Sequence, residues 1–155
     1  MNEKAKEYWN KFWGSKEQPQ QVTAEQFGYD TIIDELAKLI VEGKKTATCS
    51  AHTLYEIAKE PLPAVGKYTI ILNSKNDPVA IIRTSEVQII KMNEVSEELA
   101  LAEGSPTYDY WWNAHKEIFA IELNEYGMEF SEHMLLVFEK FELIDIKAIK
   151  QQGGH

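Results

Sequence analysis

Residues 42–50 read Glu-Gly-Lys-Lys-Thr-Ala-Thr-Cys-Ser, a stretch that lies between a predicted helix and a predicted strand. Before it, residues 30–41 carry isoleucine and leucine at spacings of three and four, which predicts a helix with one apolar face. Gly43 stands where the end of a helix favours a residue that tolerates positive φ. Two adjacent amines follow, and then hydroxyl and thiol side chains. The stretch therefore predicts a helix end, a turn and the start of a strand.

The same stretch suggests chemistry. Lys45 and Thr48 are three residues apart and would face opposite ways in a regular strand, so they converge only if Thr46 and Ala47 form a turn or bulge. Repulsion from Lys44 lowers the proton affinity of Lys45, and an amine near neutrality can serve as the general base for a hydroxyl nucleophile. A plainer interpretation is also open: a capping glycine, two solvated lysines and a threonine-rich edge strand.

Length and charge limit the classes of function. A chain of 155 residues predicts one domain over 1–150, with a flexible tail at 151–155. We expect no secretory signal and no membrane partner, because no apolar run is long enough to cross a bilayer. The single cysteine, Cys49, excludes an internal disulfide and fits a cytoplasmic location. The formal net charge of −9 argues against long duplex nucleic acid and favours a nucleoside-like small molecule or a short RNA; the oligomeric state stays open.

Periodicity and turn residues predict the elements. Helices are expected at 3–14, 30–41, 95–102 and 108–125, with Asp30 as the N-cap of the second. A hairpin is expected from strands at 67–73 and 79–90, and a last pair of strands within 134–149. Residues 15–24 are expected to form a polar loop, and residues 52–60 fit a helical turn. No metal ligands or phosphate-binding glycines occur at typical spacings, so no metal and no cofactor are predicted.

Three kinds of residue outside the central stretch have two interpretations each. Trp9 and Trp13 share a helix face, where they either cover a hydrophobic surface or form a stacking platform for a base. Arg83 is the single arginine and either pairs with a carboxylate or points into a polar pocket. His115 lies on the same apolar stripe as Trp111, and is either a satisfied core group or a catalytic one.

Several landmarks, in order along the chain, resemble the ASCH-domain family of the PUA-like superfamily, in its longer bacterial type. They are Trp9–Trp13, Phe27–Asp30, Asp34–Ile40, Gly43–Thr48, Leu62–Gly66, Ala102–Gly104, Tyr110 and Trp111 with His115, and Val137–Phe141. The resemblance covers nearly the whole chain. It implies an α+β fold with a small, mostly antiparallel PUA-like β-barrel and flanking helices. It also implies a cleft where the loop at 43–46 meets the region of Glu103.

The resemblance further implies a nucleoside-directed amidohydrolase. In smaller relatives that act on N(4)-acetylcytidine, the equivalent residues make Lys45 the base, Thr48 the nucleophile and Glu103 the proton donor. Such a set can transfer the proton of the hydroxyl, attack the amide carbonyl and protonate the leaving amine. The candidate substrate-binding residues, including aromatic groups that could stack on a base, are Lys44, Arg83, Tyr110, Trp111 and His115.

The sequence departs from the family pattern in two places, and a second function stays open. The longer members often carry Glu-Gly-Glu-Gly-Asp, whereas Ser105-Pro106-Thr107 follows Gly104 here. The small relatives lack the N-terminal tryptophan helix. The alternative is an RNA- or nucleotide-binding module without amidohydrolase activity, or a metal-independent ribonuclease that uses the same lysine. In that alternative the phosphate contacts would be Lys44, Lys45, Lys67 and Arg83. For the amidohydrolase, Asp109 and Glu86 are the next candidates for the proton donor after Glu103.

Overall fold

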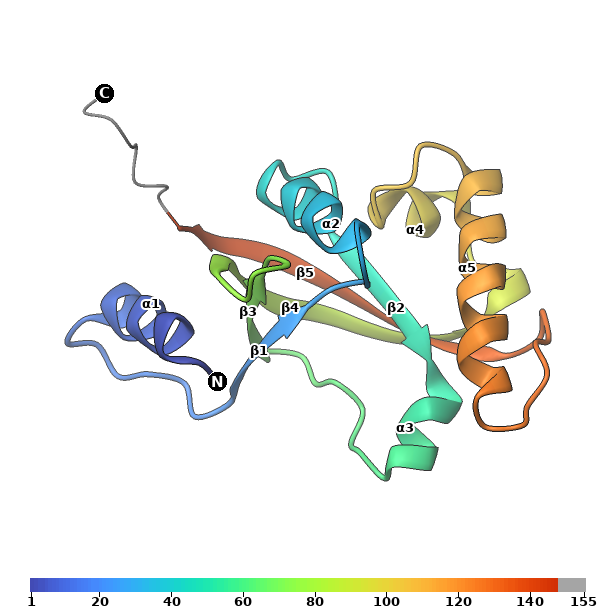
Figure 1. The fold of residues 1–155 in the computed structure, drawn as a ribbon, viewed down its shortest axis with the longest axis horizontal. Coiled ribbons are helices and arrows are strands. Elements are labelled where there is room, and N and C mark those ends of the chain that lie inside the picture. The colour runs from blue at the N-terminus through green and yellow to red at the C-terminus, as the bar shows by residue number, and fades with distance from the viewer. Residues whose placement is uncertain (148–155) are drawn as a thin grey trace. The chain divides into compact units, whose positions relative to one another are not determined.

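The computed structural model describes residues 1–147, which form helices and a mixed set of strands (Figure 1). The elements are, in order, α1 Glu3–Trp13, β1 Val22–Gln26, α2 Ile32–Val41, β2 Ala47–Ala51, α3 His52–Ala58, β3 Tyr68–Leu72, β4 Pro78–Lys91, the 3-10 turn η1 Met92–Glu94, α4 Glu97–Ala102, α5 Tyr108–Asn124 and β5 Leu135–Ile146. The strands are hydrogen-bonded in the order β1-β3-β4-β5-β2. β1 runs parallel to β3, whereas β3 with β4 and β2 with β5 are antiparallel.

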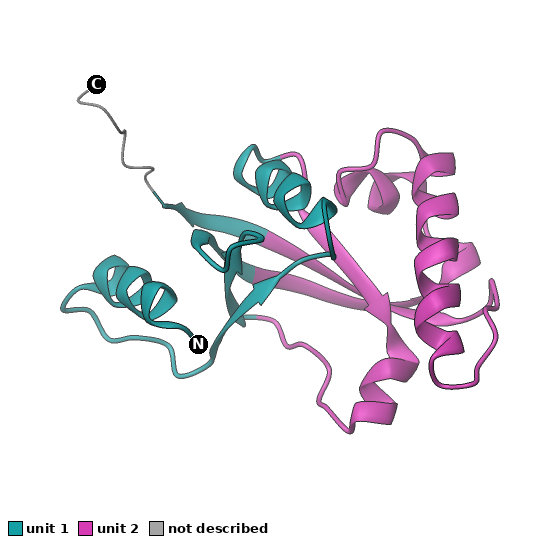
Figure 2. Cartoon of the chain, viewed as in Figure 1, with its two compact units in different colours: residues 1–43, 66–83, 142–155 teal, residues 44–65, 84–141 magenta. Residues whose placement is uncertain are grey.

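The chain divides into two compact units (Figure 2). Unit 1 contains residues 1–43, 66–83 and 142–155, and unit 2 contains residues 44–65 and 84–141. Neither unit is a continuous stretch of sequence, because β4 and β5 each pass from one unit into the other. Residues 151–155, which the sequence predicts as a flexible tail, lie outside the described residues.

Unit 1 is built on the hairpin of β3 and β4. From α1, the side chains of Tyr8 and Trp9 pack with Ile70 and Ile81 in a buried cluster. Trp9 is 4% exposed, and its ring meets that of Trp13 edge to face at a centroid distance of 5.6 Å. This burial supports the packing interpretation of the two tryptophans over a stacking platform.

Three predictions of local structure in unit 1 and its strands are wrong. Residues 22–24, expected in the polar loop at 15–24, belong to β1, whose polar side chains gave no strand pattern and whose ladder comes from the distant β3. Asp30 is not the N-cap of α2, since the helix begins at Ile32 after Thr31, and Asp30 adopts a φ of 49°. The expected pair of strands at 134–149 is the single strand β5, which contains no glycine or proline that could form a turn.

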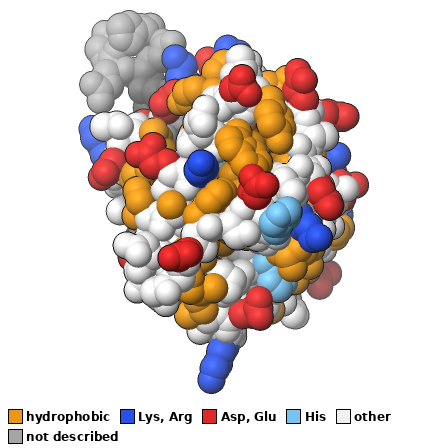
Figure 3. All heavy atoms as spheres, turned by 90° about the vertical axis from the view of Figure 1, so that its right-hand side faces the viewer, with side chains coloured by type: hydrophobic (Ala, Val, Ile, Leu, Met, Phe, Trp, Pro, Cys, Tyr) orange, Lys and Arg blue, Asp and Glu red, His pale blue; other side chains and the backbone are white. Residues whose placement is uncertain are grey.

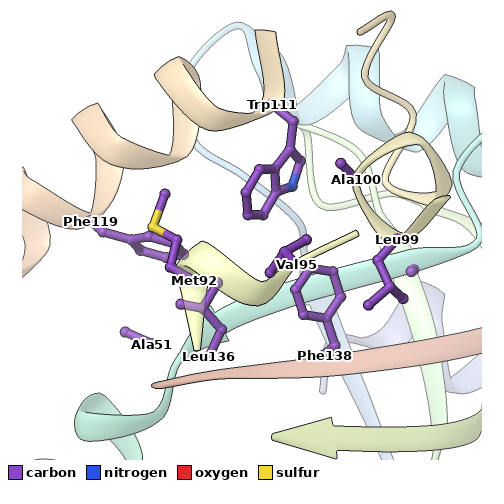
Figure 4. Close-up of a cluster of buried hydrophobic side chains, with 10 residues drawn as sticks. Ala51, Met92, Val95, Leu99, Ala100, Trp111, Phe119, Leu136 and Phe138 are labelled. Atoms are coloured by element: carbon purple, nitrogen blue, oxygen red, sulfur yellow. The ribbon is translucent and has the colours of Figure 1, made fainter. Parts of the chain in front are cut away.

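Unit 2 has its own hydrophobic core, in which Trp111 points from α5 toward Phe138 on β5 (Figure 4). The core also contains Ala47 and Ala51 of β2, Met92 and Val95 after β4, Leu99 and Ala100 of α4, and Phe119 and Leu136. Side-chain caps fix the starts of both helices: Ser96 Oγ accepts from the N–H of Leu99 in α4, and Thr107 Oγ1 accepts from the N–H of Tyr110 in α5. The short connection between α4 and α5, which contains Glu103, therefore ends at a capping residue, Thr107.

Within residues 1–147, the helices are all too short or too polar to span a bilayer.

Candidate functional site

The loop before β2 brings Lys45 to the end of α4. Gly43 follows α2 with a φ of 75°, the left-handed conformation predicted for it. Residues 44–46 are irregular, and β2 starts at Ala47. The N–H of Thr46 donates to the carbonyl of Ala102 at 2.7 Å, while the Thr46 carbonyl accepts from the N–H of Phe141. These two bonds hold the loop against α4 and β5. The predicted turn between helix and strand is present, but it ends one residue earlier than expected.

Lys45 is a buried lysine, with 3% of its surface exposed. Its Nζ donates to the carbonyl of Ala47 at 2.7 Å and to the carbonyl of Glu103 at 3.3 Å, and it lies 3.9 Å from Glu103 Oε1. Burial lowers the pKa of Lys45, and the negative charge of Glu103 opposes this effect. The pKa of Lys45 is lowered, as the sequence predicted, but the cause is different. Desolvation lowers it, and not repulsion from the exposed Lys44.

Glu103 is the C-cap residue of α4 and is 5% exposed. Its Oε2 accepts hydrogen bonds from Trp111 Nε1 and from His115 Nε2, the latter at 2.8 Å. Burial by itself would raise the pKa of Glu103, but the charge of Lys45 and the hydrogen bonds from His115 and Trp111 lower it to about 2. Glu103 is therefore a carboxylate at neutral pH. It is the anion on which the three other side chains converge.

His115 holds a proton in a defined place. Its Nδ1 lies 2.8 Å from the carbonyl of Trp111, which can only accept, so Nδ1 must be the donor. Its Nε2 faces the carboxylate of Glu103, so one further proton is shared between these two groups. The imidazole also stacks on the Trp111 indole at a centroid distance of 4.6 Å. Both ring nitrogens are satisfied, yet 19% of the side chain is exposed.

Cys49 is a member of this cluster that the sequence analysis did not include. In β2 its side chain shares a face with Ala47 and Ala51, and it packs against the core of unit 2. Burial, followed by the charge of Glu103 and a hydrogen bond to it, raises the pKa of the thiol. The sequence feature that could have indicated its position is the alternation of side chains along β2, which places Cys49 on the same face as Ala47 and Ala51.

Thr48 lies on the other face of β2. It pairs with Glu139 of β5, and Glu139 Oε1 accepts a hydrogen bond from Thr84 at 3.3 Å. Because side chains alternate along a strand, Thr48 points away from the face of Cys49. The Lys45 amine, in contrast, reaches the carbonyl of Ala47 in a terminal strand of the sheet order. The structure thus brings Lys45 and Glu103 together. Thr48 directly follows Ala47, whose carbonyl accepts the hydrogen bond from the Lys45 amine.

The remaining predicted binding residues have separate positions. Trp111 is fully buried, and its indole N–H donates to Glu103. Tyr110 beside it is 58% exposed. Lys44 is exposed. Arg83 belongs to unit 1, where its guanidinium lies 6.0 Å from the centroid of the Tyr68 ring, an arrangement that neither of the two predicted alternatives included.

Comparison with known proteins identifies the class. Residues 23–145 match the ASCH domain, and this chain belongs to the ASCH domain family. The chain is similar to the crystal structure of an ASCH domain from Lactobacillus crispatus, with 31% identity and a TM-score of 0.88, covering 92% of this chain and 95% of that one. It is also similar to protein EF3133 from Enterococcus faecalis, of family DUF984, with 39% identity and a TM-score of 0.86, covering 94% of this chain and 91% of that one.

These matches confirm the predicted family and the predicted α+β, PUA-like fold class. No functionally curated protein matches the chain. The activity has therefore to be argued from the side chains of unit 2.

Proposed function

We propose that this protein is a nucleoside-directed amidohydrolase whose general base is Lys45. The observation that carries the proposal is the burial of this amine against the Ala47 carbonyl and Glu103 in an ASCH domain. Lysines are rarely buried unless they are paired, and burial lowers the pKa of Lys45, so that its amine releases its own proton more readily and can then act as a base.

Thr48 is the proposed nucleophile. Lys45 takes the proton of the Thr48 hydroxyl, and the oxygen attacks the amide carbonyl of a substrate bound over the edge of β2. The tetrahedral intermediate then expels the exocyclic amine, which needs one proton, and leaves the acyl group on Thr48. Water then attacks the acyl group: its hydroxyl leaves with the acid, and its remaining proton goes to the Thr48 oxygen. Lys45 releases to solvent the proton that it took in the first step. The half-buried position of Thr48 next to Ala47 supports this role, because the amine is held at the Ala47 carbonyl.

The low pKa of Glu103 refines its proposed role as proton donor. A carboxylate cannot donate, so Glu103 must first receive the proton that His115 Nε2 holds at 2.8 Å. Its proposed function is then to pass this proton to the leaving amine. His115, which keeps part of its ring in contact with solvent, can take up a replacement after each turnover.

The proposed substrate is a free acylated nucleoside in the cytoplasm. Stacking on the base is assigned to Tyr110, since Trp111 is buried in the core of unit 2. Lys44 is the proposed contact for polar groups of the substrate because it is exposed next to Lys45. The acidic net charge supports a small neutral substrate over a nucleic-acid strand.

The direct test is acetate release from N(4)-acetylcytidine. We expect activity in the wild type, and a loss of at least about a hundredfold in Lys45→Met and in Thr48→Val, which is the scale of one acid-base or nucleophilic group. Lys91→Met, at an exposed position in β4, is the matched control and is expected to keep wild-type activity. Equal rates from the wild type and Lys45→Met would refute the base. Equal rates from the wild type and Thr48→Val would refute the nucleophile alone.

A further inference from the structure

We infer that Cys49, Glu103 and His115 form a zinc-binding site in unit 2. The three residues are far apart in the sequence, and the structure brings them together from β2, the end of α4 and the middle of α5. One ligand atom from each, the Cys49 sulfur, a carboxylate oxygen and an imidazole nitrogen, lies within 4.8 Å of both others. Sulfur, nitrogen and carboxylate oxygen are the three donor types that zinc uses in proteins.

The distances suit a tetrahedral ion. Ligands bonded to zinc at about 2.0–2.3 Å lie about 3.5 Å from one another. The three donor atoms lie within 4.8 Å of one another, and His115 Nε2 is 2.8 Å from Glu103 Oε2, so small side-chain rotations have to bring these spacings to the value for a bound ion. Three protein ligands leave the fourth position of a tetrahedral ion to water, the pattern of zinc sites that are open to small molecules.

The surroundings of the three donors resemble the outer shell of a metal site. His115 Nδ1 donates to the carbonyl of Trp111 at 2.8 Å, and this bond leaves Nε2 directed at the cluster. Backbone carbonyls commonly hold the second nitrogen of a zinc-bound histidine in this way. Glu103 is oriented by the indole N–H of Trp111, which is itself fixed in the hydrophobic core (Figure 4).

Binding replaces protons with the ion. The Cys49 thiol and His115 Nε2 each lose a proton to solvent. The zinc ion then binds to the thiolate, to the imidazole and to the carboxylate of Glu103. The Lys45 amine faces this position, with its Nζ 3.9 Å from Glu103 Oε1. Solvent can reach the cluster through His115, whose side chain is 19% exposed; histidine side chains are visible on this side of unit 2 (Figure 3).

Zinc would occupy the same atoms of Glu103 and His115 that form the proposed proton relay, so the metal-bound and relay states exclude each other; the test of metal binding itself needs no activity. The metal-free full chain is titrated with Co²⁺ under reducing conditions, and the near-ultraviolet band of a cobalt–thiolate bond is recorded together with the visible bands of a four-coordinate ion. Zn²⁺ is then added to displace Co²⁺ and give the affinity for zinc. We expect one equivalent of Co²⁺ and a thiolate band. That band can only arise from Cys49, the single cysteine.

Two variants and a control complete the test. Cys49→Ser is expected to abolish the thiolate band, and His115→Gln to weaken zinc binding by more than about tenfold, the loss seen when even an outer partner is removed. His133→Gln, an exposed histidine bonded to Asn93, is expected to bind like the wild type. Absence of the thiolate band in the wild type would overturn the inference even if the variants fail to fold. So would equal zinc affinity in a folded His115→Gln.

Discussion

Glu103 is the residue on which the candidate site depends. Its buried carboxylate accepts hydrogen bonds from Trp111 Nε1 and His115 Nε2 and forms an ion pair with Lys45. Removing one partner of a buried ion pair typically destabilises a protein by about 3–5 kcal/mol, because the other charge is left without compensation. Loss of Glu103 would leave the buried Lys45 amine in that situation.

The pH dependence of stability tests this role. The pKa of Glu103 is lowered from 4.5 to about 2 in the folded protein, so the unfolded chain takes up a proton at a higher pH than the folded one. The stability contributed by Glu103 is present above pH 4.5 and is lost as the pH falls toward 2. We expect Glu103→Gln to be less stable at neutral pH and to lose part of the acid slope, measured by urea unfolding between pH 2 and 7.

Glu98→Gln is the matched control, since it removes an exposed carboxylate from the same helix. This control is expected to retain the wild-type slope. If Glu103→Gln also retained it, the ionisation of Glu103 in the folded state would be disproved.

The sequence predicted part of this residue network. The motif at 43–48 and the Glu-Gly pair at 103–104 indicated Lys45 and Glu103, which the structure places 3.9 Å apart. It did not indicate the contact of Cys49 with Glu103, because that contact depends on which face of β2 is covered by α4 and α5. Nor could it give the burial of Trp111, since a helical stripe does not say how far a side chain is from solvent.

At the scale of elements, two caps hold the helices that supply the site. α5 carries both Trp111 and His115, and its first turn is closed by the bond from the Tyr110 N–H to Thr107 Oγ1 at 3.1 Å. A helix that starts elsewhere would shift both side chains relative to Glu103. The cap therefore contributes to the geometry of the site as well as to stability.

Thr107→Ala should destabilise the protein by about 1 kcal/mol, since one N–H at the start of α5 loses its partner. The comparison is with Thr31→Ala, at the N-cap position of α2, where the side chain makes no capping hydrogen bond. That variant should stay within about 0.5 kcal/mol of the wild type. Denaturant midpoints of the two variants measure the difference, and equal losses would contradict a capping role for Thr107.

Periodicity predicted the long elements and failed on those defined by distant partners. The four expected helices and the β3–β4 hairpin are present, with changes at their ends. β1 was missed because its five residues owe their conformation to a parallel ladder with β3. β5 was predicted as a pair of strands, the first of them at 135–141, whereas the structure continues the same strand to Ile146.

For the whole molecule, charge separates the proposed function from its alternative. A formal net charge of −9 opposes the approach of phosphates, and strand binding relies on the release of counterions. A neutral nucleoside has no such dependence. The confirmed family and fold do not decide between the two, because one fold can carry several activities.

We therefore expect a tenfold rise in salt to change kcat/KM for N(4)-acetylcytidine by less than about twofold, since no phosphate contact is involved. A short single-stranded RNA measured by anisotropy is the comparison. Binding of that RNA at low salt, lost steeply as salt rises, together with no hydrolysis of the nucleoside, would favour the RNA-binding alternative.

The interleaving of the two units has a consequence for how the protein is made. Unit 2 needs residues up to Phe141, and unit 1 needs residues from Glu142 onward, so both obtain their share of β5 only after residues 135–146 have been synthesised. A chain built from consecutive domains completes its first domain while the rest is still being synthesised. Here α1, β1 and the hairpin leave the ribosome long before β5 is available to them. Their apolar surfaces must therefore be kept from aggregating until β5 has left the ribosome.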